Sequence, residues 1–319
     1  MLLYIGTWNV AWGHTYIAKG FGKIYALRSL AGGSELCVIP EPVISSDGPF
    51  ICKPGTDGWS SYPTPGEHSC HITLLEREAV VADYTSGTLS LFPLDASGLP
   101  CGEPEIMHFE GNGPHPVRQT SPHIHSSWLS PDGDSIIVAD LGSDRLYRFA
   151  VRGGKIDTGS RETFAMPSGC GPRHCAFGKD KLYVTTELSD EVLVLDWPSM
   201  KQIQRVEVNP ARPGGGGHIA LSPDGLFLYA SSRLDNDGIA VFKIGEDGLL
   251  EKTGYYPTGS HPRHFCMTPS GDTLLVACRD SDEVQIFTRK AIDGSLSFTG
   301  QTIAIEKPVF VEAYEEDRL

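Results

Sequence analysis

Histidine recurs along the chain at the start of short apolar runs, at intervals of about 45 to 55 residues. The five positions are His71, His125, His174, His218 and His264. A second set of charged residues stands where the next apolar run ends: Asp83, Asp140, Glu187, Arg233 and Arg279. Imidazoles exchange protons near neutral pH, carboxylates can orient water, and guanidinium groups bind carboxylates or phosphates. The two sets together predict a site of mixed charge for acid–base chemistry on an anionic molecule.

Each position also has a structural explanation. A histidine at a strand start can hydrogen-bond the backbone of a neighbouring sheet, and an aspartate after a strand often caps a turn. For any single histidine we favour that explanation. We favour chemistry for four residues taken together, because acids and arginines alternate on one repeated scaffold: His125, Arg173, Glu187 and Arg233. Four more residues are candidates for binding the substrate, although inter-sheet salt bridges explain the two arginines equally well: Arg118, His123, Asp140 and Arg263.

The elements that must position these residues repeat with them. Five segments read as strand, turn, strand, short turn and strand, and a weaker fourth strand, such as EKTGYYP at 251–257, follows in the connection. The segments cover residues 68–94, 122–149, 171–197, 216–244 and 261–289. About 45 residues and four strands per repeat is typical of a β-propeller blade. We therefore predict an all-β chain that forms a single β-propeller domain over residues 1–319.

The two ends of the chain complete the pattern. KPVFV at 307–311 falls one repeat after His264, and LLYIGTW and GKIYALRS near the start supply strands for the same closing blade. Closure by both ends removes an exposed sheet edge. We predict seven blades with a degenerate first blade, in which PVISSDGPFICKPG is a reduced hairpin and TDGWSSYPTPGEH is a loop. A six-bladed ring with a long loop is the alternative.

The composition of the chain limits the kinds of molecule that it is expected to bind. The formal net charge of −14 and the pI near 5.2 disfavour nucleic acid and anionic membrane surfaces. The N-terminus reads as neither a secretion signal nor a membrane span, and the eight cysteines are scattered without a C-x-x-C pair. We expect a cytoplasmic monomer with free thiols, with no cofactor and no metal, acting on a small anionic substrate.

Several motifs resemble one known family. They are RQTSPHIH at 118–125, ADLGSDRLYRF at 139–149, GPRHCAF at 171–177, TEL at 186–188, SPDGLFLYASSR at 222–233, HPRHF at 261–265, KPVFV at 307–311 and YIGTW at 4–8. The chain resembles the lactonase family of seven-bladed propellers, which includes propeller-type 6-phosphogluconolactonases and carboxy-cis,cis-muconate lactonizing enzymes. The resemblance implies that His125, Arg173, Glu187 and Arg233 form the site. The shortened first blade departs from the family pattern at one wall of that site.

Three functions remain open at this stage. Opening a lactone needs activated water, a stabilised oxyanion and an acid for the leaving oxygen. Glu187 would stay ionised beside arginines and could activate water, and His125 could carry the proton. A muconate-type cycloisomerase would use the same residues to bind a polyacid and move a proton. The third possibility is a non-catalytic propeller that binds partners, which the reduced first blade favours. The resemblance favours hydrolysis of 6-phosphogluconolactone.

Overall fold

The computed structural model describes residues 2–9, 13–20, 23–30, 33–40, 60–209, 211 and 214–314. Their regular structure is β-strand, apart from two single-turn 3-10 helices, η1 (Thr158–Ser160) and η2 (Arg279–Ser281). The chain divides into two compact units, residues 1–8 with 172–319 and residues 9–171. This division does not test the single-domain prediction. In the described residues, no helix has the length and apolar character needed to cross a membrane.

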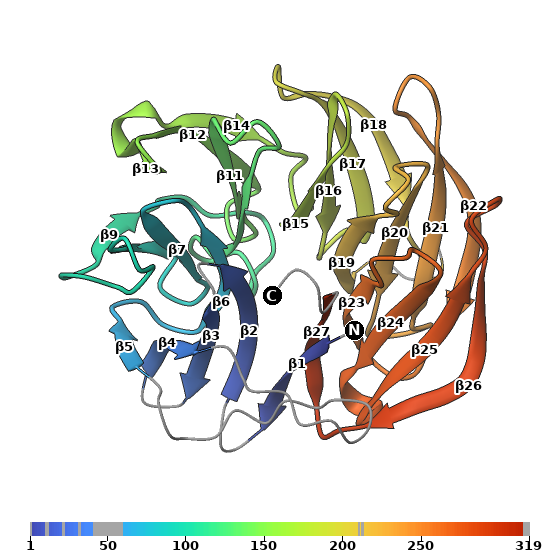
Figure 1. Ribbon diagram of the computed structural model, residues 1–319. Coiled ribbons are helices and arrows are strands. Elements are labelled where there is room, and N and C mark those ends of the chain that lie inside the picture. The colour runs from blue at the N-terminus through green and yellow to red at the C-terminus, as the bar shows by residue number, and fades with distance from the viewer. Residues whose placement is uncertain are drawn as a thin grey trace. The chain divides into compact units, whose positions relative to one another are not determined.

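The C-terminal unit, coloured yellow-green to red in Figure 1, contains three four-stranded antiparallel meanders. The first comprises β15 (Pro172–Phe177), β16 (Lys181–Thr186), β17 (Glu191–Asp196) and β18 (Lys201–Glu207). The second comprises β19 (Gly216–Leu221), β20 (Phe227–Ser232), β21 (Gly238–Ile244) and β22 (Leu250–Pro257). The third comprises β23 (Pro262–Met267), β24 (Thr273–Cys278), β25 (Glu283–Arg289) and β26 (Leu296–Ala304). Strand β27 (Pro308–Tyr314) follows and pairs antiparallel with β1 (Leu2–Asn9).

The N-terminal unit, blue to green in Figure 1, repeats the same meander. Its strands in chain order are β2 (Gly13–Gly20), β3 (Lys23–Leu30), β4 (Gly33–Pro40) and β5 (Ser60–Thr64). The next sheet holds β6 (Ser69–Leu74), β7 (Glu78–Asp83), β8 (Thr88–Pro93) and β9 (Glu105–His108). The last holds β10 (Ile124–Leu129), β11 (Ser135–Asp140), β12 (Arg145–Arg152), β13 (Lys155–Ile156) and β14 (Glu162–Ala165), with β13 and β14 both paired to β12.

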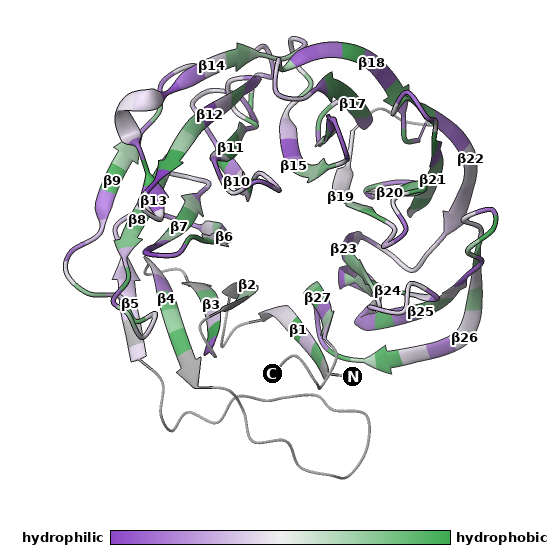
Figure 2. Cartoon of the chain, turned by 45° about the horizontal axis from the view of Figure 1, so that its top comes forward, coloured by the Kyte–Doolittle hydropathy of each residue, from purple (hydrophilic) through white to green (hydrophobic). Residues whose placement is uncertain are grey.

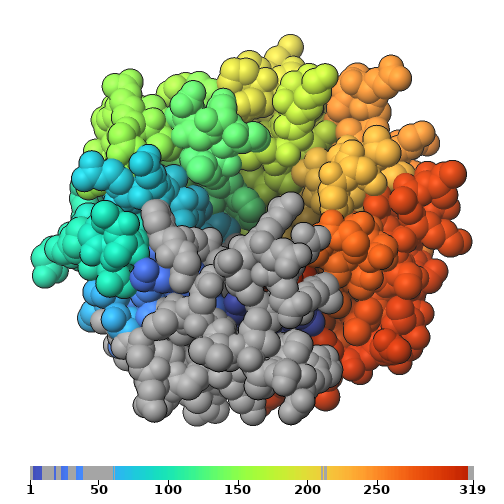
Figure 3. Space-filling model, viewed as in Figure 1, coloured from blue at the N-terminus to red at the C-terminus, as the bar shows by residue number. Residues whose placement is uncertain are grey.

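Hydropathy explains the strand order within each sheet. The second strands, such as β7 and β20, are buried along their whole length and consist mainly of Val, Ala, Leu and other apolar residues. The fourth strands, such as β18 and β26, are largely exposed and carry many polar residues, as the purple segments of Figure 2 show. Figure 3 shows β23 to β26 from outside, in orange to red. A sheet whose middle strands are buried and whose last strand is exposed to solvent fits a repeat that packs face to face with its neighbours.

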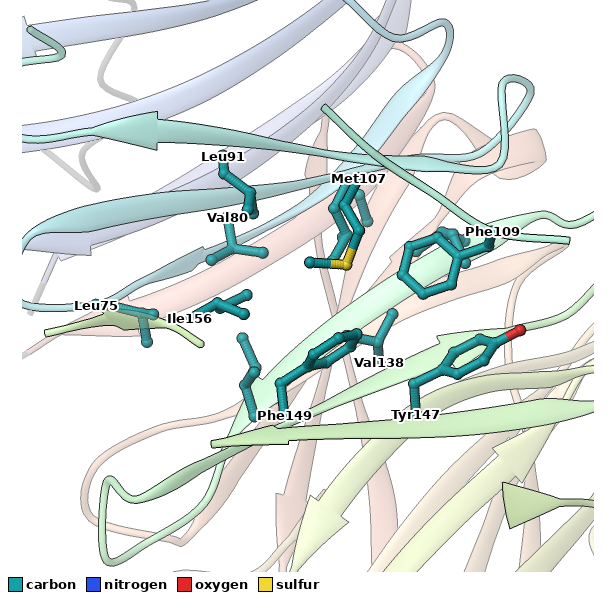
Figure 4. Close-up of a cluster of buried hydrophobic side chains, with 13 residues drawn as sticks. Leu75, Val80, Leu91, Met107, Phe109, Val138, Tyr147, Phe149 and Ile156 are labelled. Carbon is teal, nitrogen blue, oxygen red and sulfur yellow. The ribbon is translucent and has the colours of Figure 1, made fainter. Parts of the chain in front are cut away.

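The core lies between consecutive sheets. Between β6–β9 and β10–β14, Val80, Leu91 and Met107 face Val138 and Phe149 (Figure 4). The rings of Phe109 and Phe149 meet edge to face at 6.4 Å. Burial of such side chains contributes roughly 1.5–3 kcal/mol each and supplies most of the driving force for packing the sheets.

The predicted end closure is confirmed for β1 and β27, which pair from Leu2↔Tyr314 to Gly6↔Phe310. The segment GKIYALRS forms β3, whose partners are β2 and β4. PVISSDGPFICKPG lies outside the described residues. One expectation was wrong: Ser60–Thr64, within the predicted loop, forms β5 along β4. Tyr62 packs against the cluster around Leu36, and a proline is tolerated at a sheet edge.

Candidate active site

A β-bulge interrupts the start of the first strand in each of the five sheets from β6 to β26. In β15 and β23 the extra residues are Arg173 and Arg263. In β10 the extra residue is His125, between the pairs Ile124↔Asp140 and Ser126↔Ala139. Bulges re-aim side chains and are frequent beside active sites. His125 is therefore equivalent to Arg173 and Arg263.

This register corrects one prediction. His71 pairs with Ala82 and thus corresponds to Ser126, one residue after His125. The five histidines are therefore not all equivalent. His125 is the bulged residue of its strand, whereas His71 is the first paired residue after a bulge.

Three histidines of the C-terminal unit, His174, His218 and His264, contact one another through their rings. His174 Nδ1 lies 2.8 Å from His218 Nδ1, and the His218 ring lies 3.9 Å from the His264 ring. His264 in turn packs on Phe310 at 4.5 Å. All four are buried, so this column links neighbouring sheets, as the structural explanation of a single histidine expects.

Arg173, Glu187 and Arg233 meet in a buried ion-pair group. Glu187 Oε2 accepts from Arg173 Nε at 2.9 Å and lies 2.7 Å from Arg233 Nη2. Each of the three residues is less than a tenth exposed. Two guanidinium groups against one carboxylate oxygen favour its ionised form. Glu187 directly follows β16 and Arg233 directly follows β20, so equivalent strand ends of adjacent sheets bring them together.

Backbone carbonyls of the glycine run at 214–217 accept hydrogen bonds from the two arginines of this group. Arg173 donates to the Gly217 carbonyl at 2.8 Å, and Arg233 donates to the carbonyls of Gly215 and Gly216 at 3.2 Å. The amides of Gly215 and Gly216 donate instead to the Glu187 carbonyl. The run leads into β19. The N–H groups of Gly215 and Gly216 are not available to an anion, because they already have an acceptor.

His261 continues the network from Arg233. Its Nε2 lies 3.2 Å from Arg233 Nη1, and its Nδ1 lies 3.5 Å from Asp280 Oδ2. A guanidinium only donates, so Nε2 accepts and the imidazole hydrogen resides on Nδ1, towards Asp280. Burial and the nearby arginines 233, 279 and 263 lower the pKa of His261 to about 2. His261 therefore stays neutral in this group and orients Arg233.

Two further arginines lie at the more exposed end. Arg279 holds Asp280 with two hydrogen bonds of 2.8 Å. The guanidinium groups of Arg263 and Arg279 lie 5.6 and 5.3 Å from the ring centre of Trp8, whose side chain is 45% exposed. Burial, with Arg233 and Arg173 nearby, holds the pKa of Arg263 well below its usual value. Cations stacked on an exposed indole form a surface suited to a ligand.

The charges of this group do not balance. Five cations, Lys307 and the arginines at 173, 233, 263 and 279, face three carboxylates, Glu187, Asp237 and Asp280, and His261 is neutral. The described side chains thus carry an excess of two positive charges in a partly buried place, within a chain whose net charge is −14. Such an excess favours binding of an anion, and planar guanidinium groups match phosphate or carboxylate oxygens.

Three predicted residues of the N-terminal unit gather around Tyr84, which the sequence did not single out. The ring of His123 stacks on Tyr84 at 4.5 Å, and His125 meets it edge-on at 5.6 Å. Arg118 Nη2 donates to the Tyr84 hydroxyl at 2.9 Å. Tyr84 follows Asp83 at the end of β7, and that position could have signalled its role.

The carboxylate of Asp140 forms its hydrogen bonds with nearby residues of the chain. Its Oδ1 accepts from the amides of His123 at 2.8 Å and Gly142 at 3.0 Å, and its Oδ2 accepts from the Ser143 hydroxyl. The residue is fully buried. These bonds give Asp140 a structural role, so we leave it out of the proposed site.

Other residues were missed by sequence reasoning. His261 and Asp280 stand beside residues that the analysis did name, Arg263 and Arg279, and their contribution depends on a left-handed backbone at His261, with φ of 61°. Trp8 lies in a motif that was noted only for its resemblance. Among the described residues, six of the seven cysteines are buried and Cys101 is exposed.

Repeated antiparallel meanders with a charged group at equivalent strand ends define the class: an all-β propeller with an arginine-rich candidate site. A family model described as "Lactonase, 7-bladed beta-propeller" matches residues 56–313. The chain belongs to this lactonase family, and its fold is a β-propeller, as predicted.

Individual relatives agree with the family. The chain is 32% identical to a 6-phosphogluconolactonase of Bacillus subtilis, over 93% of this chain and 86% of that protein. It is 33% identical to a 6-phosphogluconolactonase of Formosa agariphila, over 75% and 72% of the two chains. A crystal structure from Bacteroides uniformis superposes with a TM-score of 0.84 at 31% identity, covering 97% of this chain and 98% of that one.

Proposed function

We propose that the protein is a metal-independent lactone hydrolase whose substrate is a phosphorylated sugar-acid lactone such as 6-phosphogluconolactone. The excess of two positive charges among the arginines around Glu187 carries this proposal, because it matches a dianionic phosphate. The names of the Bacillus and Formosa relatives support the same substrate class.

The geometry supports distinct roles for the residues. Arg263 and Arg279, at the exposed end beside Trp8, would bind the phosphate. Arg173 and Arg233 would take up the negative charge that develops on the carbonyl oxygen. Glu187, held ionised between them, would orient and deprotonate the attacking water. We retain His125 as the proton carrier for the leaving oxygen, with His123 and Arg118 as substrate-binding residues.

One observation favours a second candidate. Arg173, Glu187 and Arg233 are almost completely buried and bond to one another, as a structural ion pair between sheets would. In a non-catalytic propeller the group would hold β15–β18 against β19–β22 and bind no substrate. The two candidates differ in whether the native protein hydrolyses a lactone and, if it does, in whether the Glu187 carboxylate is needed.

The deciding experiment is hydrolysis of 6-phosphoglucono-δ-lactone in chelator, with spontaneous opening subtracted. We expect native turnover, a loss of at least 100-fold in kcat for Glu187→Gln, and native turnover for Glu191→Gln, which removes the carboxylate of a partly exposed pair with Arg205. Arg279→Met should raise KM more for the phosphorylated lactone than for unphosphorylated glucono-δ-lactone. Absence of turnover in the native protein would favour the non-catalytic propeller, whereas full activity of Glu187→Gln would overturn the role of Glu187 as the base.

A further inference from the structure

A cavity lies within the C-terminal unit, towards the opposite ends of its strands from the arginines. It has a volume of about 520 Å³ and is bounded by the ends of β19 and β23, the turns that follow them, and β27. The arginine group lies at the starts of β15 and β23 and just past β16, β20 and β24. A six-residue strand spans roughly 17–20 Å, so most of the cavity lies away from the candidate active site, and His218 in its wall is linked to Arg173 through His174.

Most residues that line the cavity have apolar side chains, among them Leu221, Pro223, Phe265, Met267 and Pro269, and polar atoms also face it. The hydroxyl of Thr268 is already engaged with Ser270 and Asp272. Glu312 is the only acidic residue among those that line the cavity. The wall therefore offers one carboxyl group in an apolar setting.

Glu312 has no ion pair and no side-chain hydrogen bond among the residues that the structure describes. It is partly exposed, as expected for a side chain that borders a cavity. Desolvation alone raises the pKa of its carboxyl group to about 7. A carboxylate in an apolar cavity without a partner is costly, and a cation or hydrogen-bond donor supplied by a ligand removes that cost.

His218, at another part of the wall, is a fixed donor. Arg173 Nη1 donates to His174 Nε2 at 3.1 Å, so His174 carries its hydrogen on Nδ1. That hydrogen is donated to His218 Nδ1, and His218 therefore carries its own hydrogen on Nε2. The cavity thus has a fixed imidazole tautomer on one wall and a carboxyl group on another.

We propose that this cavity is a second binding site, for a small molecule with an apolar body and one protonated amino group that pairs with the Glu312 carboxylate. The apolar walls contact the body of the ligand, and the volume suits a molecule the size of a benzylamine derivative. Binding there requires no change at the arginine group.

The test is calorimetric titration of the full chain with benzylamine and with its uncharged isostere, benzyl alcohol. We expect the native protein to bind benzylamine at least tenfold more tightly than Glu312→Gln does, while benzyl alcohol binds both equally. Glu306→Gln, which removes an exposed carboxylate shortly before β27, is the matched control and should bind benzylamine like the native protein.

A second variant guards against misfolding of the first. Leu221→Trp fills the cavity from β19 and should weaken both probes, while lactone hydrolysis stays within twofold of native in each variant. Equal benzylamine affinity in the native protein and both cavity variants, or no heat of binding at millimolar probe, would overturn the proposal. Because the readout is binding of benzylamine, failure of the lactonase assay leaves this test intact.

Discussion

At the scale of single residues, the solvent exposure of an ion pair determines how much it contributes to the free energy of unfolding. Arg173 is buried and serves three acceptors: Glu187, His174 Nε2 and the Gly217 carbonyl. Arg173→Met leaves these groups desolvated with fewer donors, so we expect a loss of roughly 3–5 kcal/mol in the free energy of unfolding. Arg205→Met breaks a pair with Glu191 whose arginine is 45% exposed, and should cost about 0.2–1 kcal/mol. Urea denaturation of both variants measures the contrast; equal losses would contradict it.

The histidine tautomers follow from the same arginine. His174 should carry its hydrogen on Nδ1 and His218 on Nε2, because the guanidinium of Arg173 only donates. Nitrogen chemical shifts of labelled histidines should report this arrangement at pH 6. In Arg173→Met the constraint on His174 Nε2 is lost, and His174 should become protonated on acidification. Two histidines with the same tautomer in the native protein would show that the chain of bonds is wrongly assigned.

At the scale of elements, the glycine run shows why close backbone approach is needed. Gly214 and Gly215 both have a left-handed backbone, with φ of 109° and 101°. A Cβ on Gly215 would overlap the carbonyl oxygen of Arg233, whereas on Gly214 its nearest neighbour is the Leu188 oxygen at 3.5 Å.

Gly214→Ala should therefore cost only the backbone strain, about 1 kcal/mol, while Gly215→Ala should cost more than 3 kcal/mol and lower lactone hydrolysis by displacing Arg233. Thermal unfolding together with the hydrolysis assay compares the two adjacent variants. Similar effects of the two substitutions would mean that the loop relaxes around the new side chain.

The strands were largely predictable, and the register was not. Alternating apolar runs and Pro-Asp-Gly turns predicted the sheets, because short-range patterning fixes which face of a strand is buried. The sequence gives no sign of the bulge at His125. His125 was therefore aligned with His71, although His71 corresponds to Ser126 in the strand pairing. Strand β5 was missed because Pro63 argues against a strand except at a sheet edge.

The candidate site was predictable in part, for the same reason. Arg173, Glu187 and Arg233 follow from their places in the repeat, and they do meet. His261, Asp280 and Trp8 join through contacts between segments far apart in the chain, which a repeat pattern does not report.

At the scale of the whole molecule, stability should respond to pH through buried groups of opposite sign. Burial raises the pKa of Asp83 to about 6 and those of Asp190 and Glu312 to about 7, so these carboxyl groups bind protons more tightly folded than unfolded. Their contribution to the free energy of unfolding falls as pH rises from about 4.5 to 7. His261 acts in the opposite sense: its folded pKa of about 2 lies below the unfolded value, so its contribution rises as pH rises towards 6.5.

Two single substitutions separate these effects. The free energy of unfolding of the native protein minus that of Glu312→Gln should fall between pH 5 and 8, by at most about 3 kcal/mol. The difference between the native protein and His261→Gln should rise between pH 4 and 6.5 and then stay constant. Denaturant titrations at half-unit pH steps measure both curves, with Glu306→Gln as the flat control. Parallel curves for Glu312→Gln and His261→Gln would contradict the assigned environments, because Glu312 is a desolvated acid with no partner among the described residues and His261 is a buried base among arginines.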